Sequence, residues 1–190
     1  WNLNIFSKIE NKNFYDECLT KHNIQYKFNS IYKFNNVNDY SNLLKSFHFW
    51  NNFIEDYILI FQYDSLAFNK FNYQFLNYNY IGAQWPIHIQ QIKNIFNGNG
   101  GTSLRNVQVM KDITLKYNYK NNDLSTPEDI FFSKYLFNEK LLMNNPNICN
   151  DFSFENVLNN NSIYGHAIYE SISHDNLENF ILNKIKHLLI

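Results

Sequence analysis

The segment Tyr57-Ile58-Leu59-Ile60-Phe61 decides the fold class of this chain. It is a continuous apolar run that contains two β-branched residues, and it ends abruptly in Gln62-Tyr63-Asp64-Ser65. A short apolar run of this kind predicts a strand buried on both faces, as at the centre of a parallel sheet. Asp64 then lies just beyond the carboxyl end of that strand, where open α/β sheets collect their ligands.

The residues before this segment alternate between strand and helix patterns. Asn2–Lys8 and Ile24–Phe34 have the alternating pattern of strands, and Asn13–His22 has apolar residues at helical spacing. Asp39–Ile54 predicts a long helix that Asp39 or Ser41 would cap. This order predicts an α/β fold whose early strands form a parallel sheet.

The pattern is less regular after residue 61, which favours a mixed sheet there. Thr126 is expected to cap a helix that has Pro127 in its first turn. The other expected elements are a strand over Tyr80–Trp85 that Pro86 ends, a helix within Leu104–Leu115, and a closing helix over Asp175–Ile190. No linker and no internal repeat is evident, so we expect one domain over residues 1–190.

Composition excludes several classes of protein. Lys and Arg number 16 and Asp and Glu number 17, so a net charge of −1 argues against a nucleic-acid-binding protein. No segment approaches the roughly 18 apolar residues that span a bilayer, so we expect no transmembrane segment. Cys18 and Cys149 cannot form a disulfide framework, and we expect free buried thiols in a reducing compartment, the cytoplasm.

Four local features could carry chemistry, and each has a plain structural alternative. Asp64 could hold a divalent cation or only open a turn. Asn97–Thr102 holds three of the five glycines, which permit positive φ and close approach of a ligand, or only a tight turn. Glu128-Asp129 could be catalytic or could complement a helix dipole. His166 could be a ligand or a structural histidine.

The order of these features resembles a family catalogued as a domain of unknown function that is related to GT-A nucleotide-sugar glycosyltransferases. The resemblance runs from about Phe47 to Tyr169. The matching stretches are Ile58–Ser65, Tyr80–Trp85, Gly98–Arg105, Pro127–Phe132, and Phe152–Glu155 followed by Gly165-His166. It implies a GT-A-like, Rossmann-type mixed sheet flanked by helices, with a first strand that precedes Trp1.

The resemblance also implies roles for individual residues. Asp64 stands where GT-A enzymes carry the metal-binding Asp-x-Asp motif, whose first position is Gln62 here, and His166 would be a further ligand of Mn²⁺ or Mg²⁺. Asp129 would be the general base, and Glu128 would orient the acceptor. The expected donor- and acceptor-binding residues are Gln62, Asp64, Ser65, Trp85, Asn99, Gly100, Gly101, Ser103 and Arg105. Alternatively, Trp85 is a core residue beside Pro86, and Arg105 is a solvated helix residue.

The expected function is transfer of a sugar from a nucleotide-diphosphate donor to a hydroxyl group, with inversion favoured. By analogy the donor is a UDP-sugar, and the acceptor is a glycan, a protein or a lipid-linked molecule. The alternative is a catalytically inactive sugar-binding or scaffold domain. The degenerate motif Gln62-Tyr63-Asp64 leaves this alternative open. The helix N-terminus is expected to lower the pKa of Asp129 and keep it ionised.

Overall fold

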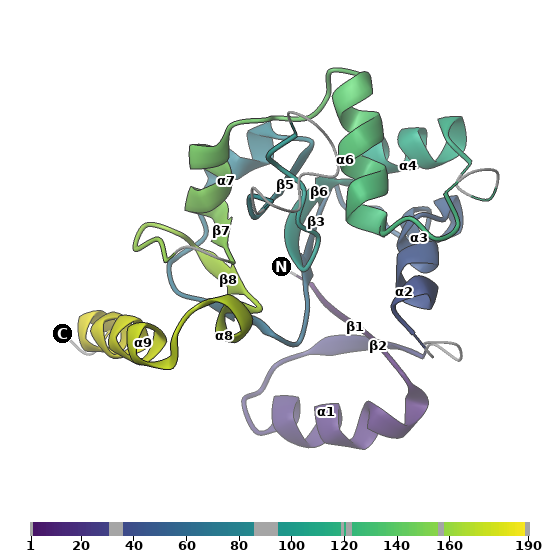
Figure 1. Ribbon diagram of the computed structural model, residues 1–190. Coiled ribbons are helices and arrows are strands. Elements are labelled where there is room, and N and C mark those ends of the chain that lie inside the picture. Colours follow the sequence, from purple (N-terminus) through teal and green to yellow (C-terminus); the bar gives the residue numbers. More distant parts are fainter. Residues whose placement is uncertain are drawn as a thin grey trace.

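The computed structural model describes residues 2–30, 36–85, 95–118, 120, 123–155 and 158–188. Pro86 and the expected strand residues 31–34 lie outside this part, as do residues 189–190 at the end of the expected last helix. In the described part the protein is a mixed α/β fold with three small sheets (Figure 1). Within these residues, no helix has the length and apolar character that crossing a membrane requires.

The first sheet has the parallel βα pattern that the sequence predicts. β1 (Leu3–Ser7) pairs in parallel with β2 (Tyr26–Ser30), and a 3₁₀ turn (Ile9–Asn11) and α1 (Lys12–Thr20) connect them. Cys18 lies on the exposed side of α1, so only Cys149 is the buried thiol that was expected.

The central sheet has the order β3-β6-β5 and is antiparallel throughout. Its strands are β3 (Tyr57–Phe61), β5 (Tyr80–Gly82) and β6 (Thr102–Asn106). The expectation that Tyr57–Phe61 forms the centre of a parallel sheet is therefore wrong, because β3 pairs only with β6 among the described strands, and antiparallel to it. Both faces of β3 nevertheless contact apolar side chains, since Ile58 and Ile60 pack against one core cluster and Tyr57 and Leu59 against another.

The third sheet connects the strand-end segment to the late part of the chain. β4 (Ser65–Ala67) pairs antiparallel with β8 (Tyr164–His166), which in turn pairs in parallel with β7 (Ser153–Phe154). The remaining elements are a second 3₁₀ turn (Tyr73–Asn77), α7 (Pro146–Phe152), α8 (Ile168–Ser171) and α9 (His174–Leu188).

The long helix expected over Asp39–Ile54 is two helices. α2 (Val37–Leu44) is capped by Asn36, whose side chain accepts from the Asp39 amide, so neither Asp39 nor Ser41 is the cap. α3 (Phe47–Trp50) starts anew because the Ser46 hydroxyl accepts from the Phe49 amide. A competing cap inside an amphipathic stretch breaks the helix there.

Two helices pack beside α3 and complete the larger core. α4 (Val107–Lys116) occupies most of the stretch Leu104–Leu115 in which a helix was expected, and Leu104 and Arg105 before it belong to β6. α6 (Glu128–Asn138) has Pro127 at its N-cap, and Thr126 does not cap it. The Thr126 hydroxyl instead donates to the Asp123 carboxylate at 3.3 Å.

Candidate functional site

A cavity of about 1170 Å³ lies beside β3 and extends to the segment that follows this strand. Its walls are β1, β3 and apolar side chains of α2 and α3. One end is polar and gathers seven of the residues singled out from the sequence: Gln62, Asp64, Asn99, Gly101, Glu128, Asp129 and His166. These residues come from four separate segments of the chain.

Strand pairing brings Asp64 and His166 together. Ser65 is the register partner of His166 in the β4–β8 pair, so the residue before Ser65 lies beside the His166 ring. His166 Nε2 is 3.4 Å from Asp64 Oδ1 and 3.1 Å from Gln62 Oε1. The two residues to which the resemblance assigns one cation are therefore neighbours, although they lie far apart in the sequence.

Another acidic residue, Glu155, lies on the opposite side of the imidazole. Its Oε1 is 3.3 Å from His166 Nδ1, and its Oε2 accepts from Asn99 Nδ2 at 2.5 Å. Burial lowers the pKa of His166, but Glu155 and Asp64 outweigh it and the pKa is raised. Glu155 was not among the expected site residues; the signal that the sequence offered was its place at the end of the matching stretch Phe152–Glu155.

The glycines of residues 98–101 serve close contact rather than unusual backbone angles. No glycine among the described residues has a positive φ, so the expectation that these glycines adopt positive φ is wrong. A Cβ at Gly101 would lie 2.0 Å from His166 Nε2, and a Cβ at Gly100 would lie 2.3 Å from a Glu128 carboxylate oxygen. The turn therefore presses its backbone against the histidine on one side and against the acidic pair on the other.

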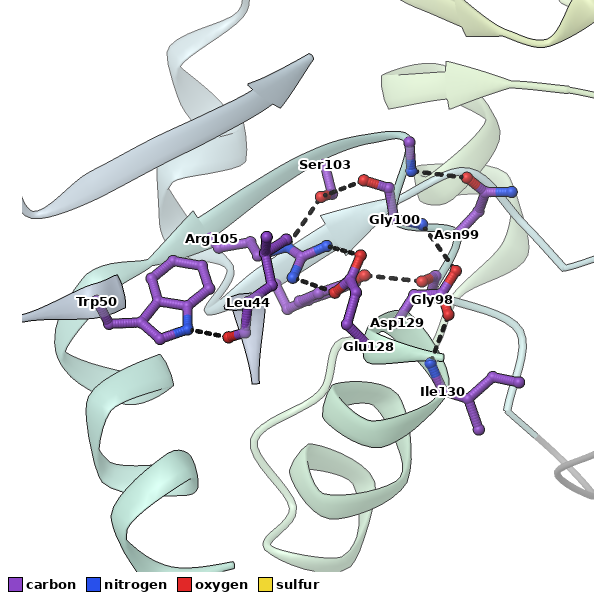
Figure 2. Close-up of polar contacts among 12 residues, drawn as sticks. Leu44, Trp50, Gly98, Asn99, Gly100, Ser103, Arg105, Glu128, Asp129 and Ile130 are labelled. Atoms are coloured by element: carbon purple, nitrogen blue, oxygen red, sulfur yellow. Dashed lines mark hydrogen bonds and ion pairs between the residues drawn. The ribbon is translucent and has the colours of Figure 1, made fainter. Parts of the chain in front are cut away.

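Arg105 is bound to Glu128 inside the protein. Two guanidinium nitrogens donate to the two Glu128 oxygens at 2.6 and 3.0 Å, and a third donates to the Ser103 hydroxyl at 2.9 Å (Figure 2). Arg105 is 0% exposed, and its guanidinium lies 4.7 Å from the centre of the Tyr80 ring. The alternative of a solvated helix residue is therefore wrong. The geometry also gives Glu128 a fixed partner that is not an acceptor molecule.

Asp129 is held at the cavity by two backbone amides. Gly100 N donates to its Oδ2 at 3.3 Å, and Ile130 N donates to its Oδ1 at 2.8 Å (Figure 2). Burial, reinforced by the Glu128 charge, raises the pKa of Asp129 to about 7. The expectation that the helix N-terminus lowers this pKa is wrong, because the loss of solvent outweighs the favourable amides. Such a pKa is close to the optimum for a general base at neutral pH.

A buried lysine fixes the loop that leads into Asp129. Lys45 Nζ donates to the backbone oxygens of Asp123 at 2.5 Å and of Thr126 at 2.6 Å. Its side chain is fully buried, and burial lowers its pKa. Because α6 begins just after this loop, Lys45 sets the position from which Glu128 and Asp129 project.

The remaining expected residues support the site or lie outside it. Ser65 and Ser103 are buried and bind neighbouring groups of the chain: Thr102 Oγ1 donates to Ser65 Oγ at 2.6 Å, and Ser103 Oγ donates to the Gly100 carbonyl at 3.1 Å. Trp85 packs against Gly98 and Ser133 and does not line the cavity. Its side chain is half-buried, and it is not among the buried core residues that the structure describes.

The polar end of the cavity holds few side chains that could ligate a cation. Among the described residues, no group of three or more His, Cys, Asp or Glu side chains has a metal-binding arrangement. Asp64 Oδ1, however, is buried without a hydrogen-bond partner and lies 3.4 Å from His166 Nε2. Mg²⁺ and similar ions bind through one or two carboxylates together with substrate phosphates, which fits this small set of ligands.

We expect the Asp129→Asn variant to change how stability depends on pH. An acid whose pKa is raised on folding stabilises the folded state below its unfolded pKa, and this contribution is lost as pH rises through about 4 to 7. Relative to the unmutated protein, the free energy of unfolding of the variant should therefore rise by up to about 4 kcal/mol between about pH 4 and pH 8. Urea unfolding of both proteins at several pH values measures it. A difference independent of pH would show that Asp129 ionises normally.

Comparison with known proteins gives one match. The family model described as "Protein of unknown function (DUF5672)" matches residues 23–166, which span every residue at the polar end of the cavity. No curated protein and no solved structure matches the chain.

Proposed function

We propose that this chain, which belongs to the family described as "Protein of unknown function (DUF5672)", transfers a sugar from a nucleotide-diphosphate donor to a hydroxyl group. The observation that carries the proposal is a carboxylate, Asp129, with a pKa of about 7 in the same cavity as the Asp64–His166 pair. Asp129 is suited to accept a proton near neutral pH, and the Asp64–His166 pair is suited to hold a cation beside a diphosphate.

Asp129 acts as the base in this proposal. The acceptor hydroxyl gives its proton to the Asp129 carboxylate while its oxygen bonds to the anomeric carbon of the donor. The bond from that carbon to the diphosphate breaks, and its electron pair leaves with the nucleoside diphosphate. Attack opposite the leaving group inverts the anomeric carbon.

The other residues position these groups. The Arg105–Glu128 pair fixes the start of α6, and the Gly100 amide holds Asp129 Oδ2. Glu155 holds the His166 Nδ1 side, so that Nε2 points toward Asp64. A divalent cation bound by Asp64 and His166 would supply positive charge to the departing diphosphate.

A second candidate function is binding of a sugar nucleotide without transfer. Gln62 favours it, because its carboxamide contacts His166 where a carboxylate ligand would strengthen a cation site. Hydrolysis of the donor by water separates the two functions, since a transferase that binds Mn²⁺ and donor cleaves it slowly and a binding domain does not.

Asp64→Asn should abolish the part of donor binding that depends on a divalent cation and leave the fold intact. Asparagine keeps the shape but not the charge that hard cations prefer. Thermal unfolding with UDP-sugars, with and without Mn²⁺, measures this, because a ligand of the native state raises the unfolding temperature.

The matched control is Asp175→Asn, an exposed residue of α9 that does not line the cavity; this variant should behave like the unmutated protein. Donor binding by the unmutated protein that does not depend on the cation would remove Asp64 from this role. No binding of any nucleotide sugar would contradict the proposed function itself.

A further inference from the structure

A series of polar contacts runs from the glycine turn to the imidazole of His166. Gly101 N donates to Asn99 Oδ1 at 3.1 Å, and Asn99 Nδ2 donates to Glu155 Oε2 at 2.5 Å. Figure 2 shows Asn99 beside Gly100 in this turn. The other Glu155 oxygen, Oε1, lies 3.3 Å from His166 Nδ1. Side chains from three separate segments of the chain are thereby connected in one series.

The direction of this series is fixed at its backbone end. A backbone amide can only donate, so Gly101 N holds the oxygen of the Asn99 carboxamide and turns the NH₂ group of that side chain toward Glu155. The backbone of Asn99 is held as well, because Asn99 N donates to Ala83 O at 3.2 Å. Asn99 is 7% exposed, so a carboxamide that turned over would leave the Gly101 amide without a partner in a buried place.

Glu155 passes this direction to His166 Nδ1. The nitrogen is buried and has no other polar partner among the described residues. Because Asn99 already donates to one Glu155 oxygen, the other oxygen remains to accept a proton from Nδ1. Burial lowers the pKa of His166, and Glu155 opposes this through a hydrogen bond, whereas Asp64 opposes it only through its charge. Glu155 is therefore the stronger acceptor for the single proton of the neutral ring.

The opposite nitrogen of the ring, Nε2, then carries a lone pair at the cavity. It lies 3.4 Å from Asp64 Oδ1 and 3.1 Å from the Gln62 carboxamide. A carboxamide offers an NH₂ group as well as an oxygen, so Gln62 is able to donate to this lone pair when no cation is bound. Only an unprotonated nitrogen ligates a cation, and a proton on Nε2 would exclude the ion.

We propose that Asn99 is a positioning residue that acts through Glu155 to keep the proton of the neutral His166 ring on Nδ1, which leaves Nε2 as the nitrogen that binds a divalent cation. Histidines that ligate metals usually donate their second N–H to a carboxylate or carbonyl group, which fixes the tautomer. Here the carboxylate is itself oriented by an amide that a backbone N–H holds in place. This role rests on the cation site of the proposed function, but it does not depend on transfer of a sugar.

Two substitutions that reverse the direction of the series test this inference. In Glu155→Gln, the NH₂ group of Asn99 still requires an oxygen, so the introduced glutamine turns its own NH₂ group toward His166 Nδ1. The proton of the neutral ring should therefore move to Nε2. Adding Asn99→Asp supplies a carboxylate that accepts from both Gly101 N and the glutamine, whose oxygen then faces Nδ1. The double variant keeps the net charge of the unmutated protein and should return the proton to Nδ1.

The ¹⁵N chemical shifts of the His166 ring report where the proton lies, because protonated and unprotonated ring nitrogens give separate signals. The spectra are recorded at the alkaline end of the pH range in which the protein is folded, where the ring is neutral. The affinity for Mn²⁺ alone, measured from the paramagnetic resonance signal of the free ion, should fall by about 10–100-fold in Glu155→Gln. It should recover in the double variant. Recovery on adding a second substitution separates positioning from damage to the fold.

Two results would overturn the proposal. A proton on Nε2 in the neutral ring of the unmutated protein would show that Glu155 does not direct the ring, and this measurement needs no variant to fold. A double variant whose ring signals match those of Glu155→Gln alone would show that Asn99 does not set the direction. Failure of the unmutated protein to bind Mn²⁺ would contradict the cation site of the proposed function, and the ring signals would still decide the role of Asn99.

Discussion

Asp129→Asn should reduce the rate of sugar transfer by about 10²–10⁴-fold, the usual loss when a general base is removed. The substitution keeps the size of the side chain and a hydrogen-bond acceptor for one of the two amides that hold Asp129. Donor affinity should change little, because the base acts on the acceptor. The largest change should appear in kcat.

The pH profile makes this test specific for a base. The unmutated protein should gain activity as pH rises through about 7, where Asp129 loses its proton. The variant should lose that rise along with the rate. Glu128→Gln is a poor control here because it disturbs the Arg105 pair. Asp175→Asn, at an exposed residue of α9, is the matched control. Near-normal transfer by Asp129→Asn would mean that inversion with this base is wrong.

Arg105→Met should lower the free energy of unfolding by about 3–5 kcal/mol, because it leaves the Glu128 carboxylate buried without its partner. Both side chains are almost free of solvent, at 0% and 4% exposure, so water cannot replace the lost hydrogen bonds. For a chain of this size the loss corresponds to a decrease in Tm of roughly 10 °C. Urea unfolding and thermal unfolding both measure it.

The double variant Arg105→Met with Glu128→Leu separates the charge effect from lost packing. Replacing both members of a buried ion pair by apolar residues of similar size is often neutral, so most of the loss should be recovered. If the double variant is no more stable than Arg105→Met alone, the loss of stability comes from lost packing around Tyr80 and not from the unpaired Glu128 carboxylate. A single variant that loses less than about 1 kcal/mol would contradict the importance of the pair.

Most local elements of this fold were accessible from the sequence, but among their pairings only the parallel pairing of β1 with β2 was. β1, α1 and β3 lie where alternation and apolar spacing predict them. The pairing direction of β3 was predicted wrongly. A continuous apolar run indicates only that both faces of a strand contact apolar groups. An antiparallel strand between two core clusters meets that condition as well as a parallel one. The break after Lys45 was missed because the Ser46 cap competes with a strong amphipathic pattern.

The site was predictable as a set of residues but not as a geometry. Asp64, Asp129 and His166 do line one cavity. The contacts that decide their chemistry join distant segments, however, and no local pattern contains them. The raised pKa of Asp129 depends on burial under the glycine turn, and the neighbour of His166, Glu155, is placed by the pairing of β7 with β8.

Lys45 has a consequence for the order in which the molecule forms during synthesis. Its ammonium binds carbonyls 78 and 81 residues further along the chain, so α6 cannot take its final position until that loop has left the ribosome. The contact between Gln62 and His166 spans 104 residues. Such distant contacts close slowly. At about 5–20 residues per second, the nascent chain carries β3 for several seconds before its acidic site can assemble. During that interval the apolar side chains of β3 lack the later-synthesised residues that cover them, and chaperones that bind extended apolar segments have access to this strand.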